Sequence, residues 1–367
     1  MKTDALIEQP TLLLDADRAR ANIRRMAEKA RRQGVRLRPH FKTHQSAEIG
    51  AWFREEGVDR ITVSSVSMAE YFAAAGWQDI TIAFPANLRE RERIRRLSQS
   101  VRLGLLAESA ETIQALDGAL DGEAGLWLKV DVGTGRTGLP WDRPETFRPL
   151  LAEARRAKHL RLRGLLAHAG HTYHAAGPDE VVALYRQSVQ RMQALRDALQ
   201  PEADAELLLS AGDTPGCSLS PELGQVEEIR PGNFVFYDVQ QMRAGACTVD
   251  QIAAAVACPV VALHPERREA VVYGGAVHLS KDTVRLGERT VFGLVAFPGE
   301  KGWELPVEGG CVTRVSQEHG IIELPAAAFE RVRVGDLLCV LPAHICLVVS
   351  NLRRYLTLDG QWIEAMG

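Results

Sequence analysis

The sequence has no long hydrophobic run, no disulfide framework and no excess of basic charge. No stretch of about 18 apolar residues occurs, and the first ten residues, MKTDALIEQP, lack the apolar core of a signal peptide. The six cysteines show neither CxxC spacing nor the density of a disulfide scaffold. The formal net charge is only -3 and no basic stripe is present. We therefore expect a cytoplasmic protein that binds neither membrane nor nucleic acid, and in which most cysteines are buried thiols.

The first two thirds of the chain alternate short apolar strands with amphipathic helical stretches, which is typical of parallel β/α units. A strand at 11–14 opens this pattern, and a helix follows that Gly34 is placed to end. Eight further strands predict a closed (β/α)8 barrel over residues 11–245. These strands are expected at 35–40, 60–65, 79–84, 101–107, 126–132, 162–168, 205–211 and 225–230.

From residue 246 the sequence changes to Val-rich runs separated by glycine and proline. This composition favours strands, so residues 246–367 are expected to form a C-terminal β domain, which residues 1–10 could join. The predicted fold class is α/β, with an N-terminal barrel and a second, β domain.

The first barrel strand ends in RPHFKTH, which places Lys42 at the barrel mouth between two histidines. Barrel enzymes carry their chemistry on the loops that follow the strands. A lysine amine with a lowered pKa can form a Schiff base with a carbonyl or with pyridoxal phosphate. By position alone, Lys42 could equally be a solvated lysine at a strand end.

Polar residues also follow strands five and six. After strand five, DVGTGRTG brings Arg136 over the mouth, where a fixed cation could hold a phenolate oxygen, although strand turns use glycine in any case. After strand six, HAGHTYH carries three imidazoles and a phenol. One of these histidines could act as a base, and we single out His171 for that role and Tyr173 as its neighbour.

The loops after strands seven and eight read SAGDTPG and RPGN. Small residues expose backbone N–H groups, and these two loops are the frequent phosphate site of β/α barrels. We therefore expect a phosphate there, while simple loop-closing turns remain the alternative.

A late segment, PAHIC, offers an imidazole and a thiol two residues apart, at His344 and Cys346. If the segment is a strand, both side chains point to the same side and form a pair suited to zinc. A lone His-x-Cys is a weak motif, and core packing is the competing interpretation.

Taken in order, RPHFKTH, DVGTGRTG, HAGHTY, SAGDTP, RPGNFVFYD, SQEHG and PAHIC resemble the D-serine dehydratase / D-threonine aldolase family, relatives of alanine racemase. The resemblance covers nearly the whole chain. It implies a barrel that holds pyridoxal phosphate and a β domain that supplies metal ligands. It also implies a homodimer that acts on a small D-amino acid.

The resemblance implies that Lys42 carries the cofactor, that Arg136 lies near the phenolic oxygen and that Tyr173 lies near the ring. Together with His171, Lys42 and Tyr173 form the expected catalytic set. The implied phosphate cradle is Gly212, Asp213, Thr214, Gly232 and Asn233.

The implied metal ligands are His344 and Cys346, with His319 close by. Cysteine at 346 favours zinc, with manganese or magnesium as alternatives, and it favours D-serine dehydratase, which forms pyruvate and ammonia. A D-threonine aldolase, which forms glycine and an aldehyde, is the alternative, and an amino-acid racemase is a more distant one. A metal-dependent hydrolase and a non-catalytic cofactor carrier fit the motifs less well.

Overall fold

The computed structural model describes residues 3–367, and the chain divides into two compact units. The first, here the barrel unit, comprises Arg25–Lys42 and Phe53–Gly232. The second, here the β unit, comprises the described residues up to Arg24 together with Thr43–Trp52 and Asn233–Gly367. The domain boundary expected between residues 245 and 246 remains a proposal.

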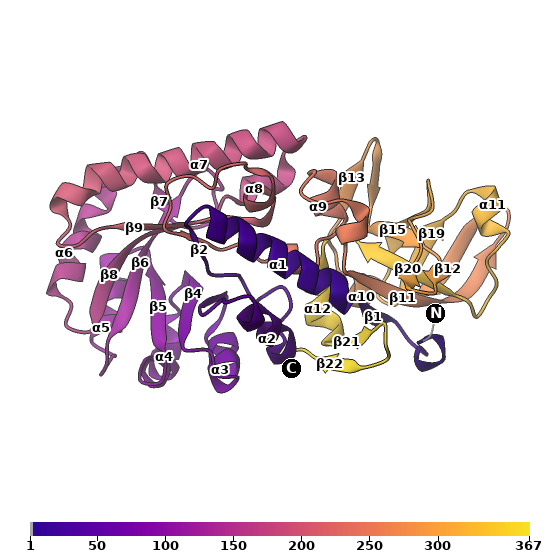
Figure 1. Ribbon diagram of the computed structural model, residues 1–367, viewed down its shortest axis with the longest axis horizontal. Coiled ribbons are helices and arrows are strands. Elements are labelled where there is room, and N and C mark those ends of the chain that lie inside the picture. Colours follow the sequence, from indigo (N-terminus) through magenta and orange to yellow (C-terminus); the bar gives the residue numbers. More distant parts are fainter. Residues whose placement is uncertain (1–2) are drawn as a thin grey trace. The chain divides into compact units, whose positions relative to one another are not determined.

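The barrel unit is built on eight parallel strands in the order β2-β10-β9-β8-β6-β5-β4-β3 (Figure 1). A parallel bridge between His40 and Thr62 joins the two ends of this order, so the ring closes. All eight predicted barrel strands are confirmed. Their bounds are β2 (Arg36–Leu37), β3 (Ile61–Val63), β4 (Asp79–Pro85), β5 (Arg102–Ala107), β6 (Ala124–Asp131), β8 (Leu160–Ala167), β9 (Leu208–Ala211) and β10 (Glu228–Ile229).

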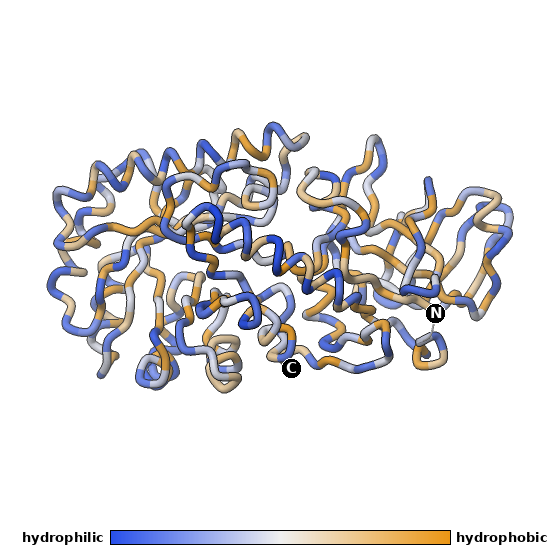
Figure 2. The backbone as a smooth tube through the Cα atoms, in the orientation of Figure 1, coloured by the Kyte–Doolittle hydropathy of each residue, from blue (hydrophilic) through white to orange (hydrophobic). Residues whose placement is uncertain are grey.

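Helices alternate with these strands, as the sequence pattern predicts. Ser65 and Ser109 cap two of them, because their side chains accept the backbone N–H groups of Met68 and Thr112. Along α7, hydrophilic and hydrophobic residues alternate with the turns of the helix, which is typical of a helix with one buried face (Figure 2). The helices are α1 (Ala16–Arg32), α2 (Ala47–Glu55), α3 (Val66–Ala74), α4 (Arg91–Ser98), α5 (Ala110–Asp117), α6 (Arg148–Arg156), α7 (Pro178–Leu199) and α8 (Thr214–Leu219).

The helix predicted after the first strand is confirmed as α1. Gly34, two residues after α1 ends, adopts a φ of 65°, the left-handed conformation that glycine accepts without strain. The division between the two units falls within α1 and again within α2. Short elements complete the barrel unit, namely β7 (Leu139–Pro140), η2 (Leu88–Glu90), η3 (Pro144–Thr146), η4 (Gly170–His174) and η5 (Gln200–Glu202).

The β unit is built on one mixed, mainly antiparallel sheet in the order β12-β19-β18-β15-β20-β11-β1-β21-β22. The expected β-rich C-terminal part of the chain is present. The strands are β1 (Thr11–Leu14), β11 (Ala254–His264), β12 (Glu269–Tyr273), β15 (Gly293–Ala296), β18 (Cys311–Val315), β19 (His319–Glu323), β20 (Leu337–Pro342), β21 (Arg354–Thr357) and β22 (Trp362–Glu364).

The strand at 11–14 is confirmed, but its place differs from our expectation. We expected β1 to open the series of β/α units, whereas it pairs antiparallel with β11 and parallel with β21 in the β unit. All four of its residues are buried. A short apolar run of this kind fits either sheet, so the sequence pattern could not assign it.

The remaining elements of the β unit are short. Two small hairpins lie outside the main sheet, β13 (Val284–Leu286) with β14 (Arg289–Val291) and β16 (Pro298–Gly299) with β17 (Gly302–Trp303). The helical segments are α9 (Val239–Arg243), α10 (Ala276–Leu279), α11 (Ala326–Phe329), α12 (Ile345–Leu352), η1 (Asp4–Leu6), η6 (Asn233–Val235) and η7 (Val249–Gln251).

One expectation from composition, that most cysteines are buried thiols, is also met by the structure. Five of the six cysteines are buried and all six are free thiols, and Cys346 alone is partly exposed. Across residues 3–367, no helix is long and apolar enough to cross a membrane.

Candidate active site

Lys42 lies just beyond the first barrel strand, in a segment that is firmly anchored. Its backbone N–H donates to Nδ1 of His40 at 3.4 Å. The preceding residue, Phe41, is fully buried, and its ring lies 4.9 Å from those of Phe53 and Phe72. Phe41 therefore fixes the backbone from which the half-exposed Lys42 side chain extends at the carboxyl ends of the strands.

Two histidines of the barrel unit lie within the electric field of Lys42. Burial lowers the pKa of His40 and of His168 well below the ordinary histidine value, and the positive charges of Lys42, Arg136 and Arg230 lower both further. Both imidazoles are therefore neutral at pH 7 and offer a hydrogen-bond donor and an acceptor rather than a positive charge.

A single contact indicates which ring nitrogen of His168 carries the hydrogen. Its Nδ1 lies 3.3 Å from the carbonyl oxygen of Gly212, which can only accept, so Nδ1 carries the hydrogen and Nε2 is left as an acceptor. The ring of Tyr173 lies 6.3 Å from the ring of His168. Tyr173 therefore lies beside His168, and its expected place near the ring of the cofactor stays a prediction.

His171 lies in a different environment. Its Nδ1 is 3.3 Å from the hydroxyl of Thr134, and its Nε2 is 3.4 Å from the hydroxyl of Ser188. Burial and the charge of Arg191 lower its pKa, and Asp131 opposes them. Both ring nitrogens of His171 thus contact hydroxyl groups. Of these two histidines, only His168 has a pKa that is lowered by the charge of Lys42.

The loop after β6 presents Arg136 in an ordered way. One carboxylate, Asp131, accepts the backbone N–H groups of Gly133 and Thr134 at 2.9 Å and that of Gly135 at 3.1 Å. Gly135 has a φ of 69°, so glycine is needed for this turn. Arg136 follows directly, is exposed, and carries a charge that reaches the Lys42 cluster.

The two loops expected to hold a phosphate are joined to each other. The backbone N–H of Gly232 donates to the hydroxyl of Thr214 at 3.3 Å. Gly212 has a φ of 109°, and a Cβ there would lie 2.8 Å from the sulfur of Cys217 and 3.2 Å from the backbone nitrogen of Arg230. Glycine at 212 therefore keeps the end of β9 close to the loop after β10.

Asp213 uses its carboxylate inside the barrel unit. Its Oδ1 accepts the hydroxyl of Thr172 and the backbone N–H of Gly216, both at 2.7 Å, and it caps α8. Burial raises its pKa to about 6. A phosphate next to a carboxylate would be repelled, so Asp213 can serve a phosphate only through its backbone N–H.

His344 and Cys346 lie at the start of a helix and not on a strand. His344 is the residue that precedes α12, and Cys346 is the second residue of that helix. The geometric premise of alternating strand residues was therefore wrong, because the chain turns from β20 into a helix at this point. The two side chains nevertheless form a hydrogen bond, which contributes to the high pKa of His344.

Asp238 orients His344. Its Oδ2, fully buried, lies 2.9 Å from Nδ1 of His344 and accepts the backbone N–H of Ile345 at 3.1 Å. Burial lowers the pKa of His344, but the charges of Cys346 and Asp238 more than offset this and raise it well above the usual value. A carboxylate that accepts from Nδ1 leaves Nε2 as the nitrogen that can bind a metal.

Asn233 belongs to the same group of side chains. Its amide nitrogen donates to Oδ2 of Asp238 at 2.5 Å and lies 3.3 Å from Nδ1 of His344. Its amide oxygen is buried and has no hydrogen-bond partner in the described part of the chain. Although we expected Asn233 in the phosphate cradle, the structure places its side chain with His344 and Asp238.

Thr43 adds a hydroxyl to this group, 3.5 Å from the sulfur of Cys346. No cluster of three or more histidine, cysteine, aspartate or glutamate side chains suited to a metal occurs among residues 3–367. A metal here would thus have two protein ligands and keep open positions for water or substrate. His319, exposed in β19, makes no hydrogen bond or ion pair with His344 or Cys346 in these residues.

The sequence did not identify several of these residues as site residues, although it contains the motifs in which they lie. His40 and His168 stand in the same motifs as Lys42 and His171, and Asp238 ends RPGNFVFYD. Their signal was present, but choosing among neighbouring polar residues requires side-chain directions that a sequence does not contain. Lys129, buried in β6 with a pKa lowered to about 8 by burial and by Arg230 and Arg136, had no such signal.

Two known protein families match different parts of the chain. The sequence profile of the alanine racemase N-terminal domain matches residues 14–239, and that of a putative serine dehydratase domain matches residues 253–358. D-threo-3-hydroxyaspartate dehydratase from Delftia sp. is 33% identical over 96% of this chain and 95% of its own. D-serine dehydratase from Dictyostelium discoideum is 27% identical over 95% of this chain and 93% of its own.

Solved structures are similar over the same extent. The Delftia D-threo-3-hydroxyaspartate dehydratase superposes with a TM-score of 0.90 at 27% identity, over 99% of this chain and 98% of that one. Two variants of that enzyme superpose with a TM-score of 0.91, one with a histidine changed to alanine and one, in the metal-free form, with a cysteine changed to alanine. In that enzyme the two substituted positions lie two residues apart.

Proposed function

We propose a reaction for this chain from one premise: the chain belongs to the family that joins an alanine racemase N-terminal domain to a serine dehydratase domain. It is a lyase with the alanine racemase-like fold. The proposed reaction removes the β-hydroxyl and the amino group of a β-hydroxy-D-amino acid. With D-serine, the products are pyruvate and ammonia.

One observation carries this proposal: His344 and Cys346 lie in contact, and Asp238 holds His344 with Nε2 available. Imidazole and thiolate together suit zinc. The same His-x-Cys spacing separates the two positions changed in the Delftia dehydratase variants, one of which is in the metal-free form. We therefore assign His344 and Cys346 as ligands of a divalent metal, with zinc favoured.

The barrel unit fits the family cofactor, pyridoxal phosphate. Lys42 supplies the amine, and Arg136 supplies a positive charge near it. The loops held together by Thr214 and Gly232 supply small residues where a phosphate would approach the backbone. We assign Lys42, Arg136 and Tyr173, with the backbone of Gly212, Asp213, Thr214, Gly232 and Asn233, to cofactor binding.

Two groups that are not part of the chain supply the difficult chemistry. Pyridoxal phosphate, if held by Lys42, would supply an electron sink for the bond that breaks at Cα. A metal held by His344 and Cys346 would supply a Lewis acid for the β-hydroxyl. The chain chooses which bond breaks by the way it positions the groups that move protons.

Lys42 Nζ is the proposed group that takes the α proton. The chain places Thr43 directly after it, and Thr43 in turn contacts Cys346. His168 and His40, both neutral, can exchange hydrogen bonds near Lys42 without adding charge.

His171 is the group that an aldolase would need as a base on the β-hydroxyl. In the structure both of its ring nitrogens face hydroxyl groups of Thr134 and Ser188. Because it does not share the surroundings of Lys42, His171 supports the aldolase alternative poorly. We therefore favour dehydration, with Lys42 as the catalytic base and Tyr173 beside it.

D-threo-3-hydroxyaspartate is the second candidate substrate. The observation that favours it is the 33% identity to the Delftia dehydratase over nearly the whole of both chains. The two substrates differ by one carboxylate at Cβ, so the same elimination yields either pyruvate or a keto dicarboxylic acid, plus ammonia in each case.

Product analysis with four substrates tests the proposal. The protein, saturated with pyridoxal phosphate and zinc, is incubated separately with D-serine, D-threo-3-hydroxyaspartate, D-threonine and L-serine. We expect keto acid and ammonia from one of the first two and little turnover of L-serine. An excess of glycine and acetaldehyde from D-threonine would favour the aldolase, and a preference for L-serine would contradict the whole assignment.

We also propose that the protein is a homodimer, as the family resemblance implies. Sedimentation velocity of the cofactor-loaded protein measures this directly. A mass of one chain over a wide concentration range would contradict it.

A further inference from the structure

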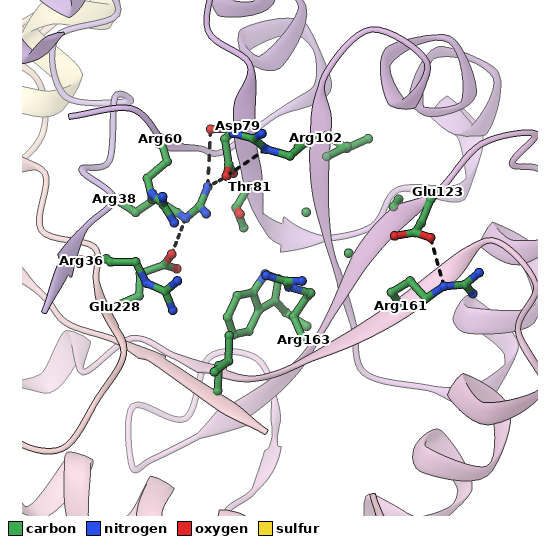
Figure 3. Close-up of a pocket in the computed structure, with 16 residues that line it drawn as sticks. Arg36, Arg38, Arg60, Asp79, Thr81, Arg102, Glu123, Arg161, Arg163 and Glu228 are labelled. Carbon is green, nitrogen blue, oxygen red and sulfur yellow. Dashed lines mark hydrogen bonds and ion pairs between the residues drawn. The ribbon is translucent and has the colours of Figure 1, made fainter. Parts of the chain in front are cut away.

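The barrel unit contains a polar cavity at the amino-terminal ends of its strands. It has a volume of about 200 Å³ and is lined by the first residues of several strands, among them Arg36 of β2, Asp79 of β4 and Arg102 of β5 (Figure 3). The chemistry of such barrels lies at the carboxyl ends of the strands, where Lys42 is found. This cavity is therefore at the amino-terminal mouth and separate from the Lys42 cluster.

Small residues open this space. Thr81, Gly104 and Gly125 are register partners on three neighbouring strands, and all three line the cavity. The apolar side of the lining includes Trp127, which packs with Leu106 and Leu166. The two glycines leave room in a layer of the barrel that large side chains would otherwise fill.

Positive charge predominates in the lining. Six arginines face three carboxylates, although the whole chain carries a formal charge of -3. Figure 3 shows Arg36, Arg38, Arg60 and Arg163 grouped around the same part of the cavity, with the pair of Arg161 and Glu123 apart from them. A charge of one sign concentrated in a hollow attracts ions of the opposite sign.

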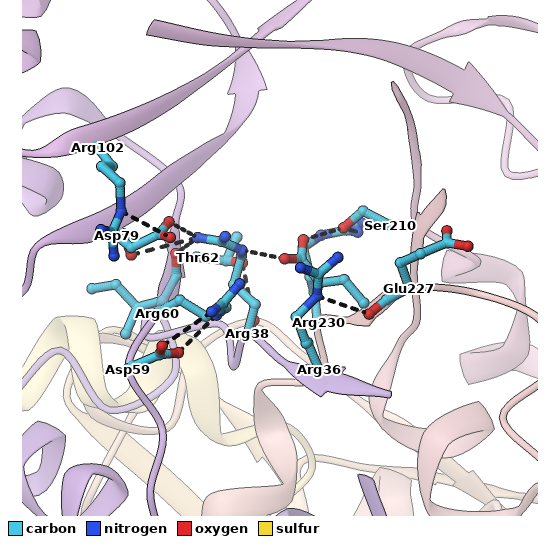
Figure 4. Close-up of polar contacts among 12 residues, drawn as sticks. Arg36, Arg38, Asp59, Arg60, Thr62, Asp79, Arg102, Ser210, Glu227 and Arg230 are labelled. Carbon is cyan, nitrogen blue, oxygen red and sulfur yellow. Dashed lines mark hydrogen bonds and ion pairs between the residues drawn. The ribbon is translucent and has the colours of Figure 1, made fainter. Parts of the chain in front are cut away.

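Two of the three carboxylates that line the cavity already form ion pairs with Arg38, the most buried arginine of the lining. Arg38 donates to Oδ1 of Asp79 and to Oε2 of Glu228, each at 2.6 Å (Figure 4). The other oxygen of Glu228 accepts the hydroxyl of Ser210 at 2.5 Å. Asp79 also forms an ion pair with Arg102, at 3.5 Å. Within residues 3–367, Arg102 pairs with no other carboxylate.

Arg36 and Arg163 are left without a carboxylate. Arg36 donates only to the backbone oxygen of Glu227, at 3.4 Å, and Arg163 makes no hydrogen bond or ion pair within residues 3–367. The stem of Arg163 lies over Gly125 of the neighbouring strand, because a Cβ at that glycine would be 3.0 Å from Cγ of Arg163. Gly125 thus gives the Arg163 side chain its place at the cavity.

We propose that this cavity binds a compact dianion, the phosphate group of inorganic phosphate or of a small phosphomonoester. The guanidinium groups of Arg36 and Arg163 bind its oxygens, and Arg38, paired with Asp79 and Glu228, also lines the cavity. Planar guanidinium groups match phosphate in geometry and in charge. A volume of about 200 Å³ admits such an ion and is smaller than the pockets above about 300 Å³ that hold larger ligands.

Titration calorimetry with the cofactor-loaded protein tests this site. Loading with pyridoxal phosphate fills the phosphate cradle first, so any further phosphate must bind elsewhere. Inorganic phosphate and glycerol 3-phosphate are titrated separately at constant ionic strength set with chloride, to tell the free ion from the ester. The variants are Arg36→Gln with Arg163→Gln, and the control is Arg186→Gln, an exposed arginine of α7 outside the cavity.

We expect saturable binding of at least one of the two ligands, at one site per chain. The double variant should weaken it by about tenfold or more, because each arginine contributes charge-assisted hydrogen bonds, and Arg186→Gln should leave it unchanged. Absence of saturable binding of both ligands would overturn the proposal. So would equal affinity in the double variant, or an equal loss in the control.

A second measurement needs no variant. Phenylglyoxal modifies accessible arginines, and mass spectrometry locates the label. Phosphate should slow the labelling of Arg36 and Arg163 in the cofactor-loaded protein and leave Arg186 unaffected. Labelling of Arg36 and Arg163 at the same rate with and without phosphate would count against the site.

Discussion

Histidines in the two units of this protein have opposite electrostatic surroundings. His168 of the barrel unit is buried near Lys42 and Arg136, and its pKa falls well below the usual value. His344 of the β unit is also buried, but Cys346 and Asp238 raise its pKa well above that value. Because both imidazoles are buried, the opposite directions of their pKa shifts come from the neighbouring charges.

The two surroundings suit the two imidazoles to different functions. A neutral imidazole next to Lys42 can exchange hydrogen bonds beside a cofactor without repelling cations. An imidazole held between a thiol and a carboxylate occupies a place that favours positive charge, which a divalent metal also satisfies. If the two units have these separate tasks, a change in one should leave the other intact.

The largest effect is expected for Lys42→Ala. Removing the amine should lower turnover by about 10³-fold or more and abolish the visible absorbance of the loaded protein, because Lys42 is proposed both to hold the cofactor and to move the proton. Zinc content should stay unchanged. The control is Lys158→Ala, an exposed lysine of the same unit.

Borohydride reduction of the unaltered protein checks the same point. Mass spectrometry should find the reduced cofactor on the peptide that contains Lys42. Reduced cofactor on another lysine would contradict the assignment of Lys42 and, with it, the function proposed for the barrel unit.

The next effect in size is expected for His344→Ala. Loss of this proposed metal ligand should reduce turnover of hydroxy substrates by more than about 100-fold, since changes around a ligand already cost about 10- to 100-fold. The visible spectrum should remain. His319→Ala is the matched control, because His319 is exposed and makes no hydrogen bond or ion pair with His344 or Cys346 within residues 3–367.

Retention of both metal and activity in His344→Ala would mean that His344 and Cys346 are packing residues. Elemental analysis of the purified variant and its control distinguishes that outcome from loss of the metal.

A smaller effect is expected for Asp238→Asn. The amide cannot accept all the hydrogen bonds that Oδ1 and Oδ2 of Asp238 now accept from Gln241, Ile345 and His344, so metal affinity should fall by about 10- to 100-fold. Excess zinc should restore most of the activity. A variant that binds zinc normally but is inactive would show that Asp238 does more than position His344.

The smallest effect concerns stability and pH. Burial raises the pKa of Asp213 from 3.8 to about 6 in the folded protein, so the folded state binds a proton more tightly than the unfolded state. This contribution is fully present below pH 3.8 and is lost as the pH rises through about 6. The loss amounts to at most about 3 kcal/mol.

Asp213→Asn should remove this dependence while its amide oxygen still caps α8. Urea unfolding of the cofactor-free protein at several pH values from about 4 to 7 measures the difference between the variant and the unaltered chain. A difference that does not change with pH would show that Asp213 is already charged throughout.

Much of the barrel unit could be predicted from the sequence, because strands that alternate with helices leave a clear period. All eight barrel strands and α1 were predicted. The assignment of β1 to its sheet was wrong because TLLL carries no information about its partners. Strand pairing depends on contacts with segments more than 200 residues away in the chain, such as Ala254–His264.

The candidate site was predicted less completely. The motifs that hold Lys42, His344 and Cys346 could be found, but the strand geometry assumed for the last two was wrong, since a helix begins between them. Which histidine of HAGHTYH faces Lys42, and which way Asn233 turns, depend on side-chain directions. These follow from hydrogen bonds that only the folded chain provides.

Metal removal from the cofactor-loaded protein tests the account most directly. The protein is treated with a chelator, separated from it, and assayed for keto acid formation from D-serine and D-threo-3-hydroxyaspartate while the visible spectrum is recorded. We predict that keto acid formation disappears, that the spectrum remains, and that zinc restores activity. Metal-free protein that forms keto acid at the full rate would contradict the account.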